Sequence, residues 1–230
     1  MKPHNFKITG GDTDSIMFCK PDMSFFSEKE QAELIDEINN LLPGIIKFAN
    51  DGVFPRVVYL KSKNYCMIDS KGKRKIKGSS LKSSTLEPDL KVFLNEMLDL
   101  IIADKMDQLV PTYNKYIKLI MNITDIKPWA KKMSLSPTTF KSTRTNETKV
   151  VDAIKGSEYG SGDRIYVYPT NDGKLKLAER YNNDHDVDIY LKKLYNTTKR
   201  FETIMDVKSM FVNYSLKGKK QALKELLEKL

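Results

Sequence analysis

The sequence predicts an α+β fold in two parts: a partial antiparallel sheet over residues 1–85 and a mostly helical part over residues 86–230. Three observations lead to this prediction. A tight turn between two short apolar runs lies near the start, a β-rich and strongly basic segment surrounds residue 60, and apolar residues recur at helical spacing from residue 89 onward. The 230 residues, 40% of them hydrophobic, suffice for one large domain or two small ones.

The first predicted element is a hairpin whose turn has the sequence Gly10-Gly11-Asp12-Thr13-Asp14-Ser15. Residues 6–9 and 16–19 are short apolar runs that predict its two strands, and the two glycines are expected to permit the bend. Because side chains alternate along a strand, Asp12 and Asp14 are expected to point the same way. A hairpin of two strands is not stable alone, so either downstream strands or another polypeptide must complete its sheet.

Asp12 and Asp14 are the first candidates for chemistry. Two adjacent carboxylates repel each other unless a cation lies between them, and oxygen ligands favour a hard ion such as Mg²⁺. A solvated turn that happens to contain two aspartates is the alternative for an isolated Asp-x-Asp.

The rest of the first part predicts one helix and two strands. Ser27 and Glu30 have the spacing of a capping box, so a helix is expected from Ser27 to Leu42, with another turn over residues 45–50. Residues 57–68 predict one strand, and residues 74–78 begin a return strand after a turn at 70–73.

Residues 61–82 hold eight basic residues and one acid. On one continuous strand, Lys61, Lys63 and Tyr65 would share a face and offer a track for a phosphate backbone. A solvated, charged hairpin is the alternative.

The second part predicts several helices and one small hairpin. The expected helices cover residues 89–109, 111–121, 150–154, 186–195, 200–205 and 219–230, and another short helix is expected to begin at Pro128-Trp129. The expected hairpin strands cover residues 164–168 and 174–178. Residues 134–148 are expected to form a loop or a short helical turn. The glycine-rich segment 156–162 lacks the Gly-Lys-Ser/Thr ending of a nucleotide-binding P-loop. Trp129 is expected to be a packing anchor.

Composition favours a polyanionic partner. The net charge of +9 and the pI near 9.3 are typical of nucleic-acid-binding proteins, although a basic protein without such a partner is the alternative. No apolar run is long enough to span a membrane, and residues 1–5 do not resemble a signal peptide. Cys19 and Cys66 are expected to be buried thiols in a reducing compartment, which favours a cytoplasmic location.

In combination, these motifs resemble the C-terminal part of a phage-like family B DNA polymerase, namely the end of its palm and its thumb. Gly11 to Ser15 resembles the metal-binding palm motif, and Lys61 to Tyr65 resembles the primer-gripping Lys-Lys-Arg-Tyr strand. Lys75 to Gly78 and Leu81 to Thr85 resemble segments that lead into the thumb, while residues 162–166 and 188–190 are similar to the thumb hairpin and a terminal helix. The chain departs from the pattern at Gly10, where the family commonly has tyrosine, and at Ser62 and Asn64, where basic residues are usual.

The resemblance implies a role for each matched residue. Asp14 would be a direct ligand of a two-metal Mg²⁺ site, Asp12 a second carboxylate, and Thr13 a contact of the incoming dNTP. The residues implied to bind primer-template DNA are Lys61, Lys63, Tyr65, Lys77, Gly78, Lys82 and Arg164.

The family's first palm aspartate, its fingers lysine and its exonuclease domain have no counterpart in these residues. The resemblance therefore implies a subunit that works only with a complementary N-terminal polymerase fragment. Alternatives are a non-catalytic DNA-binding remnant, a structural adaptor and, more weakly supported, a metal-dependent nuclease.

Overall fold

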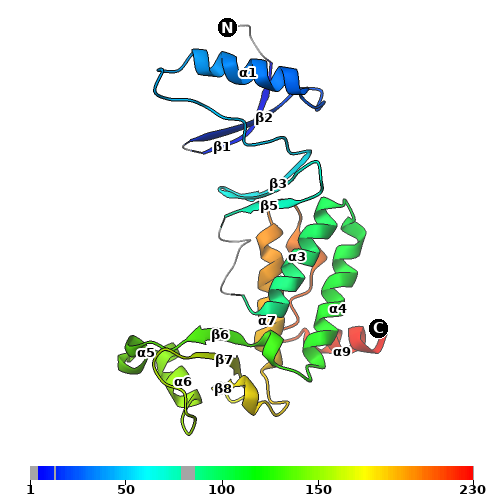
Figure 1. Cartoon of the computed structure of the whole chain (residues 1–230). Coiled ribbons are helices and arrows are strands. Elements are labelled where there is room, and N and C mark those ends of the chain that lie inside the picture. Colours follow the sequence, from blue (N-terminus) through cyan, green and yellow to red (C-terminus); the bar gives the residue numbers. More distant parts are fainter. Residues whose placement is uncertain (1–4, 13, 79–85, 230) are drawn as a thin grey trace. The chain divides into compact units, whose positions relative to one another are not determined.

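In the computed structural model the chain forms two compact units, residues 1–78 and 79–230 (Figure 1). The structure describes residues 5–12, 14–78 and 86–229. Small antiparallel sheets alternate with helices, so the predicted α+β class is confirmed. The expected boundary at residue 85 belongs to the segment 79–85, outside the described residues.

The first sheet consists of β1 (Lys7–Asp12) and β2 (Ser15–Cys19), paired antiparallel. Gly10 and Gly11 lie inside β1, so the prediction that they form the bend is wrong. The chain reverses between Asp12 and Ser15 instead, which are cross-strand partners. Asp14 is a turn residue rather than a strand residue, and strand alternation therefore does not determine where it points relative to Asp12.

The predicted capping box is confirmed at α1 (Glu28–Asn40). The Glu30 amide donates to Ser27 Oγ at 3.3 Å, and the Ser27 amide donates to Glu30 Oε2 at 2.7 Å. The helix ends before the expected Leu42, and the turn expected at residues 45–50 is not helical. The Asn39 side chain explains the difference, because its hydrogen bonds to the Phe48 amide (2.7 Å) and carbonyl (3.0 Å) hold this segment in another conformation.

The second sheet has the order β3 (Arg56–Lys61), β4 (Asn64–Ile68), β5 (Arg74–Lys77). The return strand β5 agrees with prediction, whereas the single strand expected over residues 57–68 is wrong. The chain turns back at Ser62 and Lys63, where Lys63 adopts a φ of 59°. Lys61 pairs with Asn64, the neighbour of Tyr65, so Lys61, Lys63 and Tyr65 do not share a strand face.

In the second unit, α3 (Pro88–Ile102), α4 (Leu109–Met121) and α7 (Val187–Thr198) pack together. The helix expected over residues 89–109 is interrupted. It ends at Ile102, Asp104 takes a φ of 58°, and the 3-10 turn η1 (Met106–Gln108) follows. Phe93 is buried as its spacing predicted, but its neighbour Val92 is 54% exposed.

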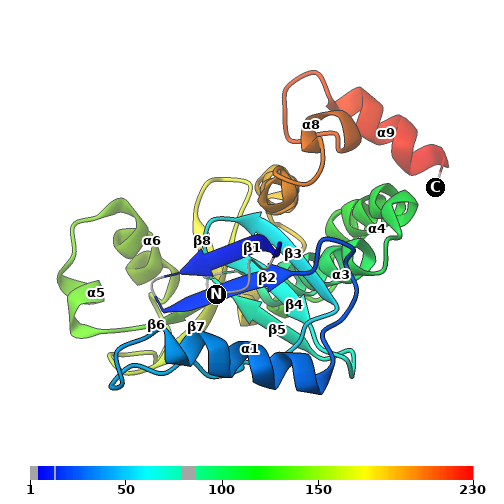
Figure 2. The ribbon, with the colours of Figure 1, turned by 90° about the horizontal axis from the view of Figure 1, so that it is seen from above.

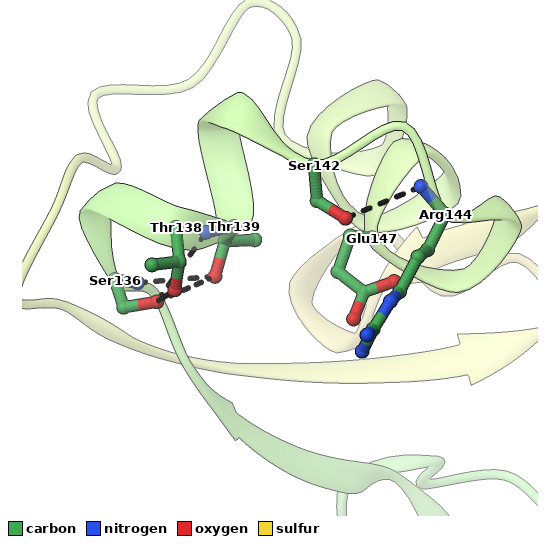
Figure 3. A pocket seen from close by; sticks show the side chains of 6 residues that line it. All are labelled: Ser136, Thr138, Thr139, Ser142, Arg144 and Glu147. Carbon is green, nitrogen blue, oxygen red and sulfur yellow. Dashed lines mark hydrogen bonds between the residues drawn. The ribbon is translucent and has the colours of Figure 1, made fainter.

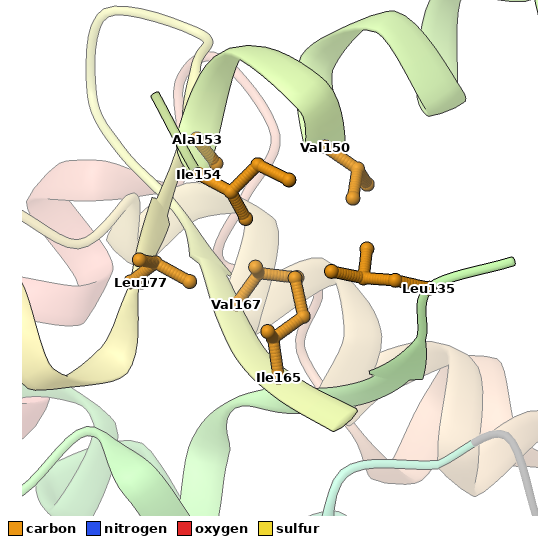
Figure 4. Packing of buried hydrophobic residues seen from close by; sticks show 7 residues of the cluster. All are labelled: Leu135, Val150, Ala153, Ile154, Ile165, Val167 and Leu177. Carbon is orange, nitrogen blue, oxygen red and sulfur yellow. The ribbon is translucent and has the colours of Figure 1, made fainter. Parts of the chain in front are cut away.

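A third sheet has the order β6 (Lys131–Ser134), β7 (Arg164–Pro169), β8 (Leu175–Leu177). The predicted hairpin is β7–β8, and β6 was not predicted because its sequence Lys-Lys-Met-Ser carries little β propensity. Of the two conformations expected for residues 134–148, the short helical turn is confirmed by α5 (Pro137–Lys141), and α6 (Thr145–Ala153) begins within the same segment. Side chains from these elements form a small core, shown in Figure 4: Leu135, Val150, Ala153, Ile154, Ile165, Val167 and Leu177.

Trp129 ends the short turn η2 (Lys127–Trp129) and is buried against Tyr190, with ring centroids 6.0 Å apart. Its predicted packing role is confirmed. Cys66 is buried as predicted, but Cys19 is only half-buried. None of the described helices is long and apolar enough to cross a membrane.

The remaining elements are short, apart from the last helix. They are η3 (Ala178–Arg180), η4 (Lys199–Phe201), α8 (Val207–Met210) and α9 (Lys220–Lys229). The helix expected over residues 200–205 is thus reduced to the 3-10 turn η4 and a further turn after it. In α9 the predicted apolar face is buried only at Leu223, while Leu226 and Leu227 are half-buried.

Candidate active site and nucleic-acid interface

The two sheets of the first unit meet at Tyr59. Its hydroxyl lies 3.6 Å from Met17 Sδ, and its ring centroid lies 5.6 Å from that of Tyr65. A Cβ atom at Gly10 would come within 2.5 Å of the same hydroxyl, so glycine permits the close approach without a shift of Tyr59. Sequence reasoning missed Tyr59; the available signal was Gly10 itself, because a glycine inside a strand often marks a close approach.

This packing brings Asp12 beside Lys63. The Lys63 ammonium lies 3.1 Å from Asp12 Oδ1, although the two residues belong to different sheets. The side chains are 71% and 44% exposed, so the ion pair contributes less than about 1 kcal/mol to folding. The ion pair matters because of where it lies: it joins the turn between β1 and β2, which carries the two aspartates, to the basic turn between β3 and β4.

Gly78 approaches the same basic turn from the end of β5. It has a φ of +96°, and a side chain there would collide with Asn64 Oδ1 and the Lys63 carbonyl. Tyr65 and Lys77 are cross-strand partners on β4 and β5. Among the predicted site residues, the structure thus unites Asp12 with Lys63 and Gly78, and Tyr65 with Lys77.

Other predicted site residues are not united with this group. Asp14 is exposed in the turn, and Lys61 lies across from Asn64 on β3. Arg164 belongs to the second unit. Thr13 and Lys82 lie outside the described residues.

Asp12 and Asp14 are ligands of the kind that Mg²⁺ prefers, but two carboxylates are too few to hold it. Mg²⁺ prefers oxygen ligands in octahedral geometry, and Asp12 and Asp14 offer carboxylate oxygens. The described residues contain no cluster of three or more His, Cys, Asp and Glu side chains able to hold a metal. By themselves, these residues do not form a magnesium site.

A second basic surface lies on the outer face of the third sheet. We call it the basic face and define it by Lys127, Lys132, Arg164 and Tyr166. Lys132 pairs with Tyr166 across β6 and β7, and the ammonium groups of Lys127 and Lys132 lie 5.6 and 5.9 Å from the Tyr166 ring centroid. Sequence reasoning found only Arg164 here, because β6 was not predicted.

A polar hollow of ≈ 470 Å³ lies beside α5 and α6, lined by Ser136, Thr138, Thr139, Ser142, Arg144 and Glu147 (Figure 3). The Ser136 hydroxyl is hydrogen-bonded to the Thr138 and Thr139 hydroxyls at 2.7 and 3.0 Å. It also accepts from the Thr139 amide as the cap of α5. The hydroxyls around Ser136 thus cap a helix, and we assign the hollow no catalytic role.

Comparison with known sequences identifies a DNA polymerase-like region in this α+β chain. No family model matches the chain. Over 75 residues it is 29% identical to a DNA polymerase of Pyrococcus horikoshii, and over 74 residues 30% identical to DNA polymerase 1 of Pyrococcus abyssi. Each alignment covers 32% of this chain but only 6% and 10% of the respective relative, so the chain spans a small part of these curated relatives.

Proposed function

We propose that this chain is the C-terminal portion of a family B DNA-directed DNA polymerase, in which residues 1–85 complete the palm and residues 86–230 form the thumb. The observation that carries the proposal is the 3.1 Å contact between Asp12 and Lys63. It brings together two motifs that are far apart in the sequence, and a polymerase needs both at the primer terminus. The similarity to DNA polymerases supports the same reaction class.

In this proposal, Asp14 and Asp12 hold Mg²⁺ together with a carboxylate from a complementary N-terminal polymerase fragment, which also carries the fingers and exonuclease. The bound metal would activate the primer 3′-hydroxyl and neutralise the departing pyrophosphate of the dNTP. Lys63, Tyr65 and Lys77 would hold the primer-template DNA near these carboxylates, with Thr13 beside the dNTP. The basic face would hold duplex phosphates without reading the sequence.

Replacing Asp14 by Asn tests this assignment in a mixture of the chain and its complementary fragment. The substitution keeps the size of the side chain and removes its charge. We expect primer extension to fall on the order of a thousandfold, as loss of several kcal/mol of metal-derived stabilisation implies. Asp107→Asn, which makes the same change at an exposed carboxylate of η1, is the matched control and should extend normally. Extension by the Asp14 variant at the wild-type rate would contradict the assignment.

A non-catalytic DNA-binding remnant is the second candidate. The small number of carboxylates at the described site favours it. The DNA-binding remnant predicts a different result: the chain would bind DNA, but its mixture with the complementary fragment would not extend a primer.

A further inference from the structure

Strand β2 has the composition of a strand that is covered on both faces. Ile16, Met17, Phe18 and Cys19 form a continuous apolar run, whereas a strand with one face in water alternates apolar and polar residues. Met17 points toward Tyr59 and the second sheet. Because neighbouring strand residues point to opposite faces, Ile16 and Phe18 lie on the other face of the β1–β2 sheet.

That other face, which we call the open face, consists of Phe6, Ile8, Ile16 and Phe18. Ile8 pairs with Phe18 across the strands, and Phe6 stacks on Phe18 with ring centroids 5.3 Å apart. Phe26 covers this end, with centroids 5.3 and 5.8 Å from the other two rings. Phe26 does not cover the end of the open face nearer the turn, where Ile8 and Ile16 are 67% and 46% exposed.

The sheet is also incomplete at its edges. No other described strand pairs with β1 or β2, and a sheet of two strands is marginal in water. No described residue between Asn5 and Tyr59 is buried, although this stretch contains a sheet and an amphipathic helix. Figure 2 shows β1 and β2 side by side, with α1 running along them.

Charge identifies the kind of molecule that covers the open face. Helix α1 begins two residues after Phe26 and carries the acids Glu28, Glu30, Glu33, Asp36 and Glu37 against the base Lys29. Lys20 pairs with Glu30 at 2.7 Å, and its ammonium lies 5.0 Å from the Phe26 ring centroid, so the border has five acids against two bases. DNA would be repelled at this border. Two copies of the chain meeting through this surface would bring the acidic helices together, which is also unfavourable. The surface therefore fits a different polypeptide that offers apolar and basic side chains.

We propose, building on the proposed function, that a second, different polypeptide adds a strand to the β1–β2 sheet and packs apolar side chains on Ile8 and Ile16. Basic side chains of this partner would face α1. Ile16 lies next to Ser15 at the end of the turn, so the same contact would bring partner residues beside Asp12 and Asp14. One surface would thus complete both the sheet and the carboxylate site.

The test uses the full chain and the adjacently encoded polypeptide that carries the remaining polymerase segments. Their affinity is measured by calorimetry for the wild type, for Ile8→Ser with Ile16→Ser, and for Leu119→Ser, a control at a 47% exposed leucine on α4. We expect the double variant to bind at least about tenfold more weakly and the control to bind normally. Circular dichroism of the unbound variants verifies that they fold, and hydrogen exchange of wild-type β1 and β2 amides should slow in the complex.

Three results would overturn the proposed surface: no complex forms, the double variant binds as tightly as the wild type, or the chain alone forms dimers that the double variant abolishes. Failure of the proposed function is a separate outcome. If the complex forms through Ile8 and Ile16 but never extends a primer, the surface stands and the polymerase assignment fails. If the double variant binds normally and the mixture extends primers, the polymerase assignment stands and the surface is wrong.

Discussion

At the scale of single residues, close backbone approaches build the candidate site. Gly10 lets Tyr59 reach the first sheet, and Gly78 lets the end of β5 reach the Lys63 turn. The sequence motifs identified Asp12, Lys63 and Gly78 individually. Their contact could not be predicted, because it depends on Lys63 leaving the strand with a positive φ, which nothing in Ser62-Lys63 signals.

Replacing Gly78 by Ala should destabilise the second sheet by about 1–3 kcal/mol, since it combines an unfavourable φ with a steric collision. Gly72→Ala is the matched control, because Gly72 also has a positive φ (+78°) but its Cβ would meet nothing within 4 Å. Hydrogen exchange of the β4 and β5 amides measures both variants. Equal effects of the two substitutions would show that the close approach at Gly78 is absent in solution.

At the scale of elements, helices and strands set by residues close in the sequence were predicted well, and those set by distant residues were predicted poorly. The start of α1 followed from the Ser27 and Glu30 spacing, because a capping box involves residues only three apart. The third-sheet strand β6 was missed because its pairing with β7 is made across about thirty residues of intervening chain, an interaction that its own residues do not encode. The break after Ile102 was likewise hidden by continuous apolar periodicity.

The cap of α1 predicts a pH dependence. The Lys20 ammonium, followed by the Ser27 amide, lowers the pKa of Glu30 from 4.5 to about 2. Because folding lowers the pKa of this carboxyl, its ionised form stabilises the fold. This contribution is complete at pH values above 4.5 and is lost as the pH falls through about 2. NMR titration of the Glu30 carboxyl should show the low midpoint in the wild type. A Lys20→Met variant should titrate closer to pH 4.5, and an unchanged midpoint would contradict the role of Lys20.

At the scale of the whole molecule, the charge excess of the chain is distributed unevenly. Helix α1 is acidic, whereas the Lys63 turn and the basic face are positively charged. Net charge alone predicted a polyanionic partner, but only the structure separates the basic surfaces, which we propose hold DNA, from the acidic surface, which we propose faces a protein. The fold class could be predicted from the sequence, and the candidate site only in part, because the contact between Asp12 and Lys63 depends on a turn that the sequence does not signal.

Duplex binding by the full chain should weaken steeply with salt. Each neutralised phosphate contributes a slope of roughly −0.9 to a plot of log affinity against log salt concentration. Lys132→Ala, on the basic face, should make the slope less negative by about 1. Lys29→Ala, on acidic α1, removes the same charge elsewhere and should leave the slope unchanged. Identical slopes for all three proteins would show that the basic face does not contact DNA.

The most direct test of the polymerase assignment is Mg²⁺-dependent addition of a dNTP to a primer, measured for the chain, for its complementary fragment and for the two together. We expect addition only by the mixture, because the proposal requires a further carboxylate beside Asp12 and Asp14, and the described residues contain no cluster of three potential metal ligands. Addition by the chain alone would contradict the need for a second polypeptide. A mixture that forms a complex but adds no nucleotide would contradict the assignment of this chain to a polymerase.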